Sequence, residues 1–518
     1  MRRCRSVALV TVSALLLSGC AVASDPQWTP PGWEEHDIRI STAPEPIDPA
    51  TVGALSGERL RNDTVGLQAR FSLLPGSGAF DDRVVGMVRD AVQGRAAAVG
   101  RAYAPEVFPL GAGLGERGCV RGATLKAGAE ILADPALGPV GGTGVAVACD
   151  IVAATGPILG ERVRVVAGDA SGVASDETTI VYADVTTGTV GSAAELWNPE
   201  ASARLHGEIV ELLRREAGAL SLATVAPADE SSLARFAPSL ETTVPGAGGS
   251  LVITIAPGFT APELVALDVP PTGSPLVIEV PAQTAATLVT PLGATLVAAG
   301  QAGAAFENPA APPAGRTPVD CDLFPCVALT YDDGPSDFTP GILDELASRR
   351  AAATFFTMGD KASRYGDVLR RMVAEGHLAE NHTWNHPHLP DIPLDAALRQ
   401  IRDATGAIEK QTGERITMFR PPYGEYTSEI VAAAGLPAIL WDVDTLDWQG
   451  ISDDVLIDRA VEQPRPGSIV LQHDIQPNTA RTAGAIYDGL RDRGFSLVTV
   501  AQLFGGQAPA SGAWRSGR

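Results

Sequence analysis

Residues 327–335 read Val-Ala-Leu-Thr-Tyr-Asp-Asp-Gly-Pro, an apolar run that ends in two adjacent carboxylates and a Gly-Pro break. The apolar run is typical of a buried strand, and Gly-Pro stops it. Adjacent residues at a strand end point in different directions, so one of Asp332 and Asp333 can bind a metal ion while the other acts as a base. Taken alone this pattern is more often a turn, so its function depends on what else lies near it.

Four further stretches place polar or aromatic residues at or beyond strand-like runs. They are His382-Thr383-Trp384-Asn385-His386, Arg420-Pro421-Pro422-Tyr423-Gly424, Asp444-Thr445-Leu446-Asp447-Trp448 and Ile469-Val470-Leu471-Gln472-His473. Imidazoles four residues apart, as in the first of these, meet on one face of a helical turn and can hold a metal ion. His377 and His388 flank that pair, and we interpret both as structural or solvated.

Helical stretches separate the strand ends. They lie at 339–350, 364–375, 394–412, 426–434, 452–462 and 479–493. Strands that alternate with helices form parallel sheets, and a barrel of this kind gathers its chemistry at the carboxyl ends of its strands. The sequence therefore predicts an α/β fold with a barrel at the C-terminus and a candidate site at one end of it.

Taken in order, the five stretches resemble the five motifs of the NodB-homology polysaccharide deacetylases, carbohydrate esterase family 4. The resemblance covers about residues 320–505. It implies a distorted (β/α) barrel of the NodB type and metal-dependent removal of N-acetyl groups from GlcNAc-type polymers. Tyr331 stands where phenylalanine is commoner, and we expect no mechanistic effect from it.

The resemblance also implies which residues bind the metal and activate water. Asp333, His382 and His386 are the expected ligands of one divalent ion, with zinc favoured and cobalt, nickel or manganese as alternatives. Asp332 is the expected general base, and Arg420 is expected to pair with it and keep it ionised.

By the same resemblance, His473 is the expected acid that protonates the leaving amine, and Asp447 raises its pKa and fixes its tautomer. The backbone N–H of Tyr423 is expected to stabilise the oxyanion together with the metal. Tyr423, Trp448 and Leu471 are the expected walls of the acetyl pocket, with simple barrel packing as the alternative.

The N-terminus carries export signals. Residues 1–19 hold three arginines and an apolar run of about ten residues, which is typical of a signal peptide. Leu17-Ser18-Gly19-Cys20 resembles the lipobox of bacterial lipoproteins, so we expect Cys20 to be lipidated; an ordinary cleaved signal is the alternative. Residues 20–50 are proline-rich and predict a tether. The chain is then anchored to the outer face of the cell membrane.

Residues 301–318, rich in Ala, Pro and Gly, predict a linker between two folded regions. Beyond it we expect a catalytic domain at 319–506 and a tail at 507–518. Before it, residues 51–300 predict an α+β extracellular domain. Its expected helices lie near 81–103 and 200–217, and its expected strands lie at 145–153, 161–167, 178–185, 251–256 and 276–280.

Within this extracellular domain, residues 181–197, 253–259 and 277–281 resemble a domain shared by certain lysozyme-sensing anti-sigma factors and some membrane-anchored deacetylases. A spacer that presents the catalytic domain is the alternative.

Four cysteines beyond Cys20 suggest two disulfides in an exported chain, paired by proximity as Cys119–Cys149 and Cys321–Cys326. A zinc site is the rival interpretation of these four cysteines, but they form no CxxC pair.

Composition excludes one class of partner. The 518 residues hold 39 Lys+Arg against 61 Asp+Glu, a formal charge of −22, which argues against general nucleic-acid binding.

The leading hypothesis is a lipid-anchored deacetylase of the GlcNAc residues of cell-wall peptidoglycan. MurNAc, chitin oligomers, exopolysaccharide or acetyl-xylan as substrate, and a wall-bound or lysozyme-sensing binding protein, are the alternatives. The sequence leaves the oligomeric state open.

Overall fold

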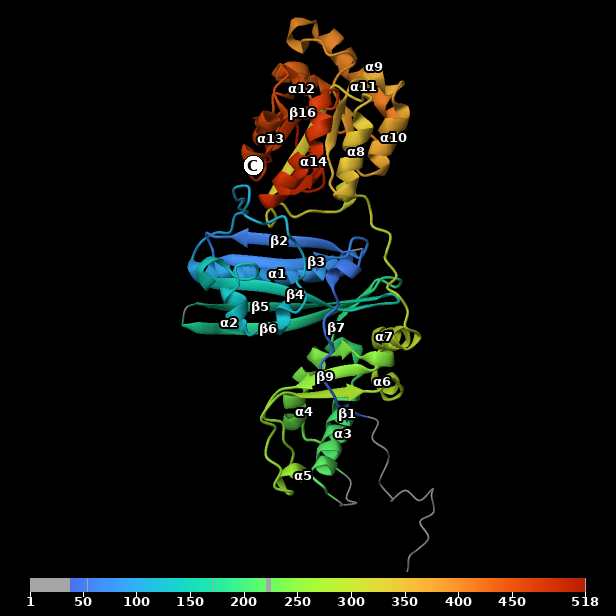
Figure 1. The fold of residues 1–518 in the computed structure, drawn as a ribbon. Helices are drawn as coiled ribbons and strands as arrows, with labels where there is room; N and C mark the ends of the chain where they lie inside the picture. The colour runs from blue at the N-terminus through green and yellow to red at the C-terminus, as the bar shows by residue number, and fades with distance from the viewer. Residues whose placement is uncertain (1–37, 54, 170, 220–224, 518) are drawn as a thin grey trace, which may run out of the picture.

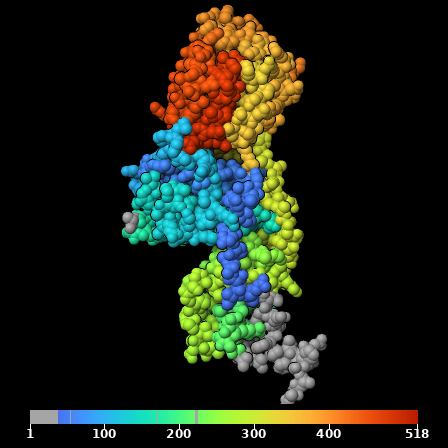
Figure 2. Space-filling model, viewed as in Figure 1, coloured from blue at the N-terminus to red at the C-terminus, as the bar shows by residue number. Residues whose placement is uncertain are grey.

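The structure, a computed structural model, describes residues 38–53, 55–169, 171–219 and 225–517. The predicted signal peptide, Cys20 and the first part of the predicted tether lie outside the described residues. Three bodies are stacked along the molecule (Figures 1 and 2): a C-terminal barrel, a middle body and a lower body. Among the described residues, no helix has the length and apolar character needed to cross a membrane.

The C-terminal body confirms the predicted distorted (β/α) barrel. Its parallel strands run in the order β13-β12-β11-β16-β15, β17 pairs with β11, and Phe419 bridges β13 to β14. The strands are β11 (Cys326–Asp332), β12 (Thr354–Thr357), β13 (Leu378–Asn381), β14 (Ala438–Ile439), β15 (Val443–Asp444), β16 (Ile469–His473) and β17 (Ser496–Val498). The helices are α8 (Thr339–Ser348), α9 (Gly359–Ala362), α10 (Gly366–Ala374), α11 (Leu394–Thr412), α12 (Ser428–Ala434), α13 (Asp453–Glu462), α14 (Pro477–Asp492) and α15 (Val500–Leu503).

Hydrophobic patterning explains these elements. Every residue of β11 is buried, as expected for a strand covered on both faces. Helix α11 has the predicted bounds and buries Ala397, Ile401, Ala404 and Ile408, which recur every three to four residues along one face.

Residues 507–518 do not form the predicted tail. They contain β18 (Ala513–Trp514), which pairs in parallel with β14. The ring of Trp514 packs edge-on against Phe504 at 5.2 Å between centroids. The barrel therefore extends to Trp514, because the short strand β14 finds a backbone partner there.

The middle body is a six-stranded sheet in the order β2-β3-β4-β5-β6-β7, covered by α1 (Gly78–Val99). Its strands are β2 (Ser56–Asn62), β3 (Leu67–Leu73), β4 (Gly144–Thr155), β5 (Ile158–Asp169), β6 (Gly172–Asp184) and β7 (Thr189–Ser192), and α2 (Gly128–Ala133) packs beside them. The sequence analysis did not predict strands β2 and β3. β2 reads Ser-Gly-Glu-Arg-Leu-Arg-Asn and contains few apolar residues. The disulfides Cys119–Cys149 and Cys321–Cys326 confirm the predicted pairing.

The lower body has a four-stranded sheet in the order β1-β10-β9-β8. Its strands are β1 (Arg39–Ile40), β8 (Val244–Pro245), β9 (Leu251–Ile255) and β10 (Leu276–Val280); its helices are α3 (Ala201–Glu216), α4 (Glu230–Phe236), α5 (Pro262–Val265), α6 (Ala282–Leu288) and α7 (Pro291–Ala302). Together the middle and lower bodies confirm the predicted α+β character of the region before the barrel.

Two segments expected to be extended connections are attached to these bodies. Residues 38–50 include β1, and Ile47 forms a β-bridge with Ile151 of the middle sheet. After α7, the chain returns past the middle body to the barrel (Figure 1), and Ala305 bridges to Thr155 on the way. Both segments have backbone groups that pair with strand edges, which composition alone does not reveal.

The middle body contacts the end of the barrel where its strands begin. Arg117 donates to the backbone carbonyls of Arg491 and Phe495, at 3.0 and 2.9 Å. The backbone N–H of Phe108 donates to the carbonyl of Arg493 at 3.0 Å. Because β17 starts at Ser496, these contacts leave the carboxyl ends of the barrel strands facing away from the middle body.

Candidate active site

Strand register brings the first candidate residues together. In the pairing of β11 with β16, Asp332 lies opposite His473, and in the pairing of β15 with β16, Asp444 lies opposite Leu471. Asp332, Asp444 and His473 end their parallel strands, as the sequence predicts, and Leu471 lies two residues before the end of β16.

Asp333, His382 and His386 form a compact group whose ligand atoms lie within 4.8 Å of one another. The Nε2 atoms of both histidines are 3.4 Å from Oδ1 of Asp333. That oxygen is buried and has no hydrogen-bond partner among the described residues. Burial raises the pKa of Asp333, but the neighbouring histidines outweigh this effect and hold the pKa well below its usual value. The group can therefore supply one carboxylate and two imidazoles to a divalent ion.

The two histidines do not lie on a helical turn, contrary to the expectation from their spacing. They follow β13 in an irregular loop in which Thr383 and His386 have φ values of +66° and +65°. Oδ1 of Asn381 accepts the N–H of Thr383 at 2.7 Å and so competes with helical bonding. His382 Nδ1 lies 2.8 Å from the carbonyl of Arg420 and donates to it, so Nε2 is left to face Asp333.

Arg420 is fully buried and joins two parts of the site. It donates to Oδ1 of Asp332 and to the hydroxyl of Thr330, both at 2.8 Å. Its remaining donors reach the carbonyls of Ile439 and Leu440, at 3.0 and 3.1 Å. The predicted Arg420–Asp332 pair is therefore present in the structure. The four acceptors of the Arg420 guanidinium fix its orientation.

His473 is held by Asp447. The Nδ1 of His473 lies 2.8 Å from Oδ1 of Asp447, whose other oxygen accepts the backbone N–H of His473 and the hydroxyl of Thr479. Burial lowers the pKa of His473, but Asp447, Asp332 and Asp333 raise it to about 9. The imidazole is therefore protonated at neutral pH, and Nε2–H is free to donate.

The ring of Tyr423 lies beside the candidate metal-binding group. Tyr423 and Trp448 are about half exposed, whereas Leu471 is buried. Tyr423 adopts a φ of +60° and packs edge-on against His386, with ring centroids 4.5 Å apart. His388 stacks on the Tyr423 ring with the centroids 3.8 Å apart and is about half exposed, in line with its interpretation as structural or solvated.

Sequence reasoning missed three supporting residues. Lys361 donates to the backbone carbonyl of Asp333 at 2.6 Å. Asp474 is buried, accepts the hydroxyl of Thr339 at 2.6 Å, and has its pKa raised to about 7 by burial. Glu425 accepts from His388 at 2.8 Å. The position of Asp474 directly after His473 could have identified it from the sequence. No sequence pattern pointed to Lys361 or Glu425.

The family model for polysaccharide deacetylases matches residues 321–438, which include β11 through the start of β14. The chitooligosaccharide deacetylase of Sinorhizobium fredii is 37% identical over 196 residues, which cover 34% of this chain and 91% of that protein. The chain belongs to the polysaccharide deacetylase family.

Other relatives of this chain extend well beyond the region that the two sequences share. The peptidoglycan-N-acetylmuramic acid deacetylase PdaC of Bacillus subtilis is 41% identical over 178 residues, 34% of this chain. The match spans 38% of the length of PdaC. The solved structure of PdaC is 40% identical, with a TM-score of 0.35, and covers 36% of this chain and 91% of that one.

Proposed function

We propose that this member of the polysaccharide deacetylase family hydrolyses N-acetyl groups of cell-wall peptidoglycan and releases acetate. The observation that carries the proposal is the juxtaposition of the Asp333–His382–His386 group with two differently charged groups: the Arg420-paired Asp332 and the protonated His473. Separate acid and base beside a metal-binding group are what amide hydrolysis requires. The matched relatives are named as deacetylases of N-acetylated glycans.

The residues present fit a divalent ion. Asp333 has a buried oxygen without a partner, and His382 is oriented through its Nδ1 so that Nε2 faces that oxygen. Two neutral imidazoles and one carboxylate favour zinc, with cobalt, nickel or manganese as alternatives. A bound ion would polarise the acetyl oxygen and lower the pKa of water.

Asp332 is the proposed base. Arg420 occupies its Oδ1, so Oδ2 is the oxygen that takes a proton from the attacking water. That Oδ2 lies 3.8 Å from Nε2 of His382, beside the metal-binding group. Arg420 also compensates the charge of the buried Asp332 carboxylate, and without this pair each group would be buried without its partner.

His473 is the proposed acid. Its raised pKa keeps a proton on Nε2 at neutral pH, and it gives this proton to the amine nitrogen as the C–N bond breaks. Tyr423 contributes its backbone N–H to the oxyanion and its ring to the acetyl pocket, together with Trp448 and Leu471.

Acetate release from isolated cell wall tests this function. The chelated protein is expected to lose activity and regain it when zinc, cobalt, nickel or manganese is restored, which also ranks the metals. Asp332→Asn is expected to remain inactive under every metal. Full activity in the chelated protein would overturn the metal-dependent mechanism.

We also propose that the chain is a lipoprotein, exported and lipidated at Cys20, on the basis of its N-terminal sequence. Peptidoglycan is then the nearest acetylated polymer. A Cys20→Ala variant is expected to leave the membrane fraction, while a variant retained in membranes would contradict this anchor.

A further inference from the structure

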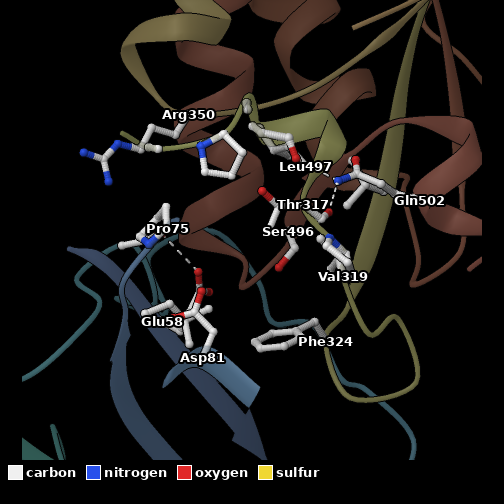
Figure 3. Close-up of a pocket in the computed structure, with 18 of the residues that line it drawn as sticks. Glu58, Pro75, Asp81, Thr317, Val319, Phe324, Arg350, Ser496, Leu497 and Gln502 are labelled. Carbon is white, nitrogen blue, oxygen red and sulfur yellow. Dashed lines mark hydrogen bonds between the residues drawn. The ribbon is translucent and has the colours of Figure 1, made fainter. Parts of the chain in front are cut away.

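A cavity of about 660 Å³ lies between the barrel and the middle body, far from the candidate active site. Figure 3 shows Glu58 and Asp81 on the wall formed by the middle body, and Ser496 and Leu497 on the barrel side. The cavity opens beside β17, which pairs with the beginning of β11, whereas Asp332 ends that strand. Six residue steps of about 3.3 Å each separate Cys326 from Asp332 by about 20 Å. The volume suits a small molecule.

Two acidic side chains, Asp81 and Glu58, lie on one wall of the cavity. Burial, together with the charges of Asp82 and Glu58, raises the pKa of Asp81 to about 6, although its Oδ1 accepts the N–H of Leu74 at 2.6 Å. Burial also raises the pKa of Glu58, although the charges of Arg117, 3.5 Å away, and of Arg491 lower it. A cation placed here would stabilise the ionised form of Asp81, so the wall is complementary to a protonated amine.

The arginines that line the cavity already have acceptors. Arg89 pairs with Asp320 at 2.9 Å, and Arg350 donates to the backbone carbonyls of Leu55 and Gly53. Arg491 donates to the carbonyl of Arg349. These acceptors are all groups other than Asp81.

The barrel side of the cavity has polar atoms without partners among the described residues. His377 is 2% exposed, and its Nδ1 accepts the N–H of Ala353 at 3.3 Å, so Nε2 carries the proton. That Nε2 and Oε2 of Glu375 are both unpaired and lie 3.7 Å apart, too far for a direct hydrogen bond. One hydroxyl group could accept from His377 and donate to Glu375, which would satisfy both buried atoms.

Apolar side chains complete the cavity. Leu73, Val85, Val319, Phe324 and Leu497 line it between the two polar regions. An aromatic ring and aliphatic side chains are suited to the C–H face of a sugar ring.

We propose that this cavity is a binding site for a small hydroxylated amine of the amino-sugar class. The ammonium group lies beside Asp81 and Glu58, one hydroxyl bridges His377 and Glu375, and the ring packs on the apolar side chains. The site is separate from the catalytic one, and its occupancy does not depend on the proposed deacetylase activity.

Calorimetric titration of the full chain with glucosamine tests the proposal, with N-acetylglucosamine as the neutral analogue. Glucosamine is expected to bind, and Asp81→Asn is expected to weaken that binding about tenfold because a charge-assisted hydrogen bond is lost. Asparagine keeps an oxygen for the N–H of Leu74, so the fold of the variant is expected to survive. Glu58→Gln provides a second variant with the same expectation.

Two controls separate this cavity from other sites. Asp90→Asn removes an exposed acid from the same helix, α1, and is expected to leave binding unchanged. Asp332→Asn changes the candidate active site and is also expected to leave glucosamine binding unchanged. Absence of glucosamine binding, equal binding by Asp81→Asn and Glu58→Gln, equal binding of N-acetylglucosamine, or loss of binding in Asp332→Asn would each overturn the proposal.

Discussion

At the scale of single residues, three side chains of the site each use one of their two polar atoms for a hydrogen bond within the protein. His382 uses Nδ1 on a carbonyl, Asp332 uses Oδ1 on Arg420, and His473 uses Nδ1 on Asp447. Each therefore presents one defined atom to the site. This arrangement orients reactive groups before substrate arrives, so less reorganisation is needed during the reaction.

Arg420 is expected to matter for both stability and rate. Arg420→Met leaves Asp332 buried without its partner, so the free energy of unfolding should fall by about 3–5 kcal/mol. Arg420→Lys keeps one charge but cannot reach the same four acceptors, and kcat should fall about 100-fold. Urea unfolding and acetate release measure the two effects. Arg399→Met, at an exposed position of α11, serves as control; equal stability of Arg420→Met and Arg399→Met would contradict this role.

His473 is expected to set the alkaline limit of activity. It must be protonated to act as an acid, so kcat should fall as the pH rises through its raised pKa, about 9. Asp447→Asn removes the main group that raises this pKa, so the alkaline limb should move to lower pH by about one unit or more. The pH profile of kcat measures this shift. Asp458→Asn, on the exposed side of α13, should leave the limb in place, and an unmoved limb in Asp447→Asn would exclude His473 as the acid.

At the scale of elements, the two disulfides close loops of different length. Cys119–Cys149 spans 30 residues and links the segment before α2 to β4, whereas Cys321–Cys326 spans only 5 residues and ends at the first residue of β11. Closing a longer loop removes more conformational freedom from the unfolded chain, so the first disulfide should contribute more to stability.

Replacing each pair by alanine measures that difference. The Cys119→Ala/Cys149→Ala variant is expected to lose about 3.5 kcal/mol of unfolding free energy, and Cys321→Ala/Cys326→Ala about 2 kcal/mol. Urea unfolding of the two variants provides the comparison, and each serves as the matched control for the other. A larger loss from the shorter loop would show that local packing, not loop closure, determines the effect.

The elements also show where sequence reasoning succeeds. Helix α11 and β10 have their predicted bounds, because strong periodicity and turn residues mark both ends. The candidate site was predictable because its residues cluster at strand ends in a recognisable order. The loop carrying His382 and His386 was not, since its backbone bends through side-chain bonds of Asn381 that spacing does not encode. Lys361 acts through a backbone carbonyl, which leaves no sequence pattern.

At the scale of the whole molecule, the barrel rests on the middle body with its catalytic end pointing away (Figure 1). Arg117 is a central contact, and Glu58 lies beside it. This stacking leaves the end of the barrel that holds the candidate active site open. It also means that contacts between the bodies can change without changing the active site.

Arg117→Ala is therefore expected to loosen the two bodies while leaving kcat/KM unchanged. Protease should then cut residues 301–318 faster, because the segment passes between bodies that the variant no longer holds together. The matched control is Arg204→Ala, on α3 of the lower body. A fall in kcat/KM together with unchanged proteolysis would contradict the separation of docking and catalysis.

The proposed function is tested most directly by mass spectrometry of muropeptides after the protein has acted on isolated peptidoglycan. We expect products that lack one acetyl group on GlcNAc, and none when Asp332→Asn or His382→Ala replaces the parent chain. Loss of the acetyl group from MurNAc would instead assign the substrate indicated by the name of PdaC. Unchanged muropeptides, or equal deacetylation by the parent chain and both variants, would contradict the proposed peptidoglycan deacetylase.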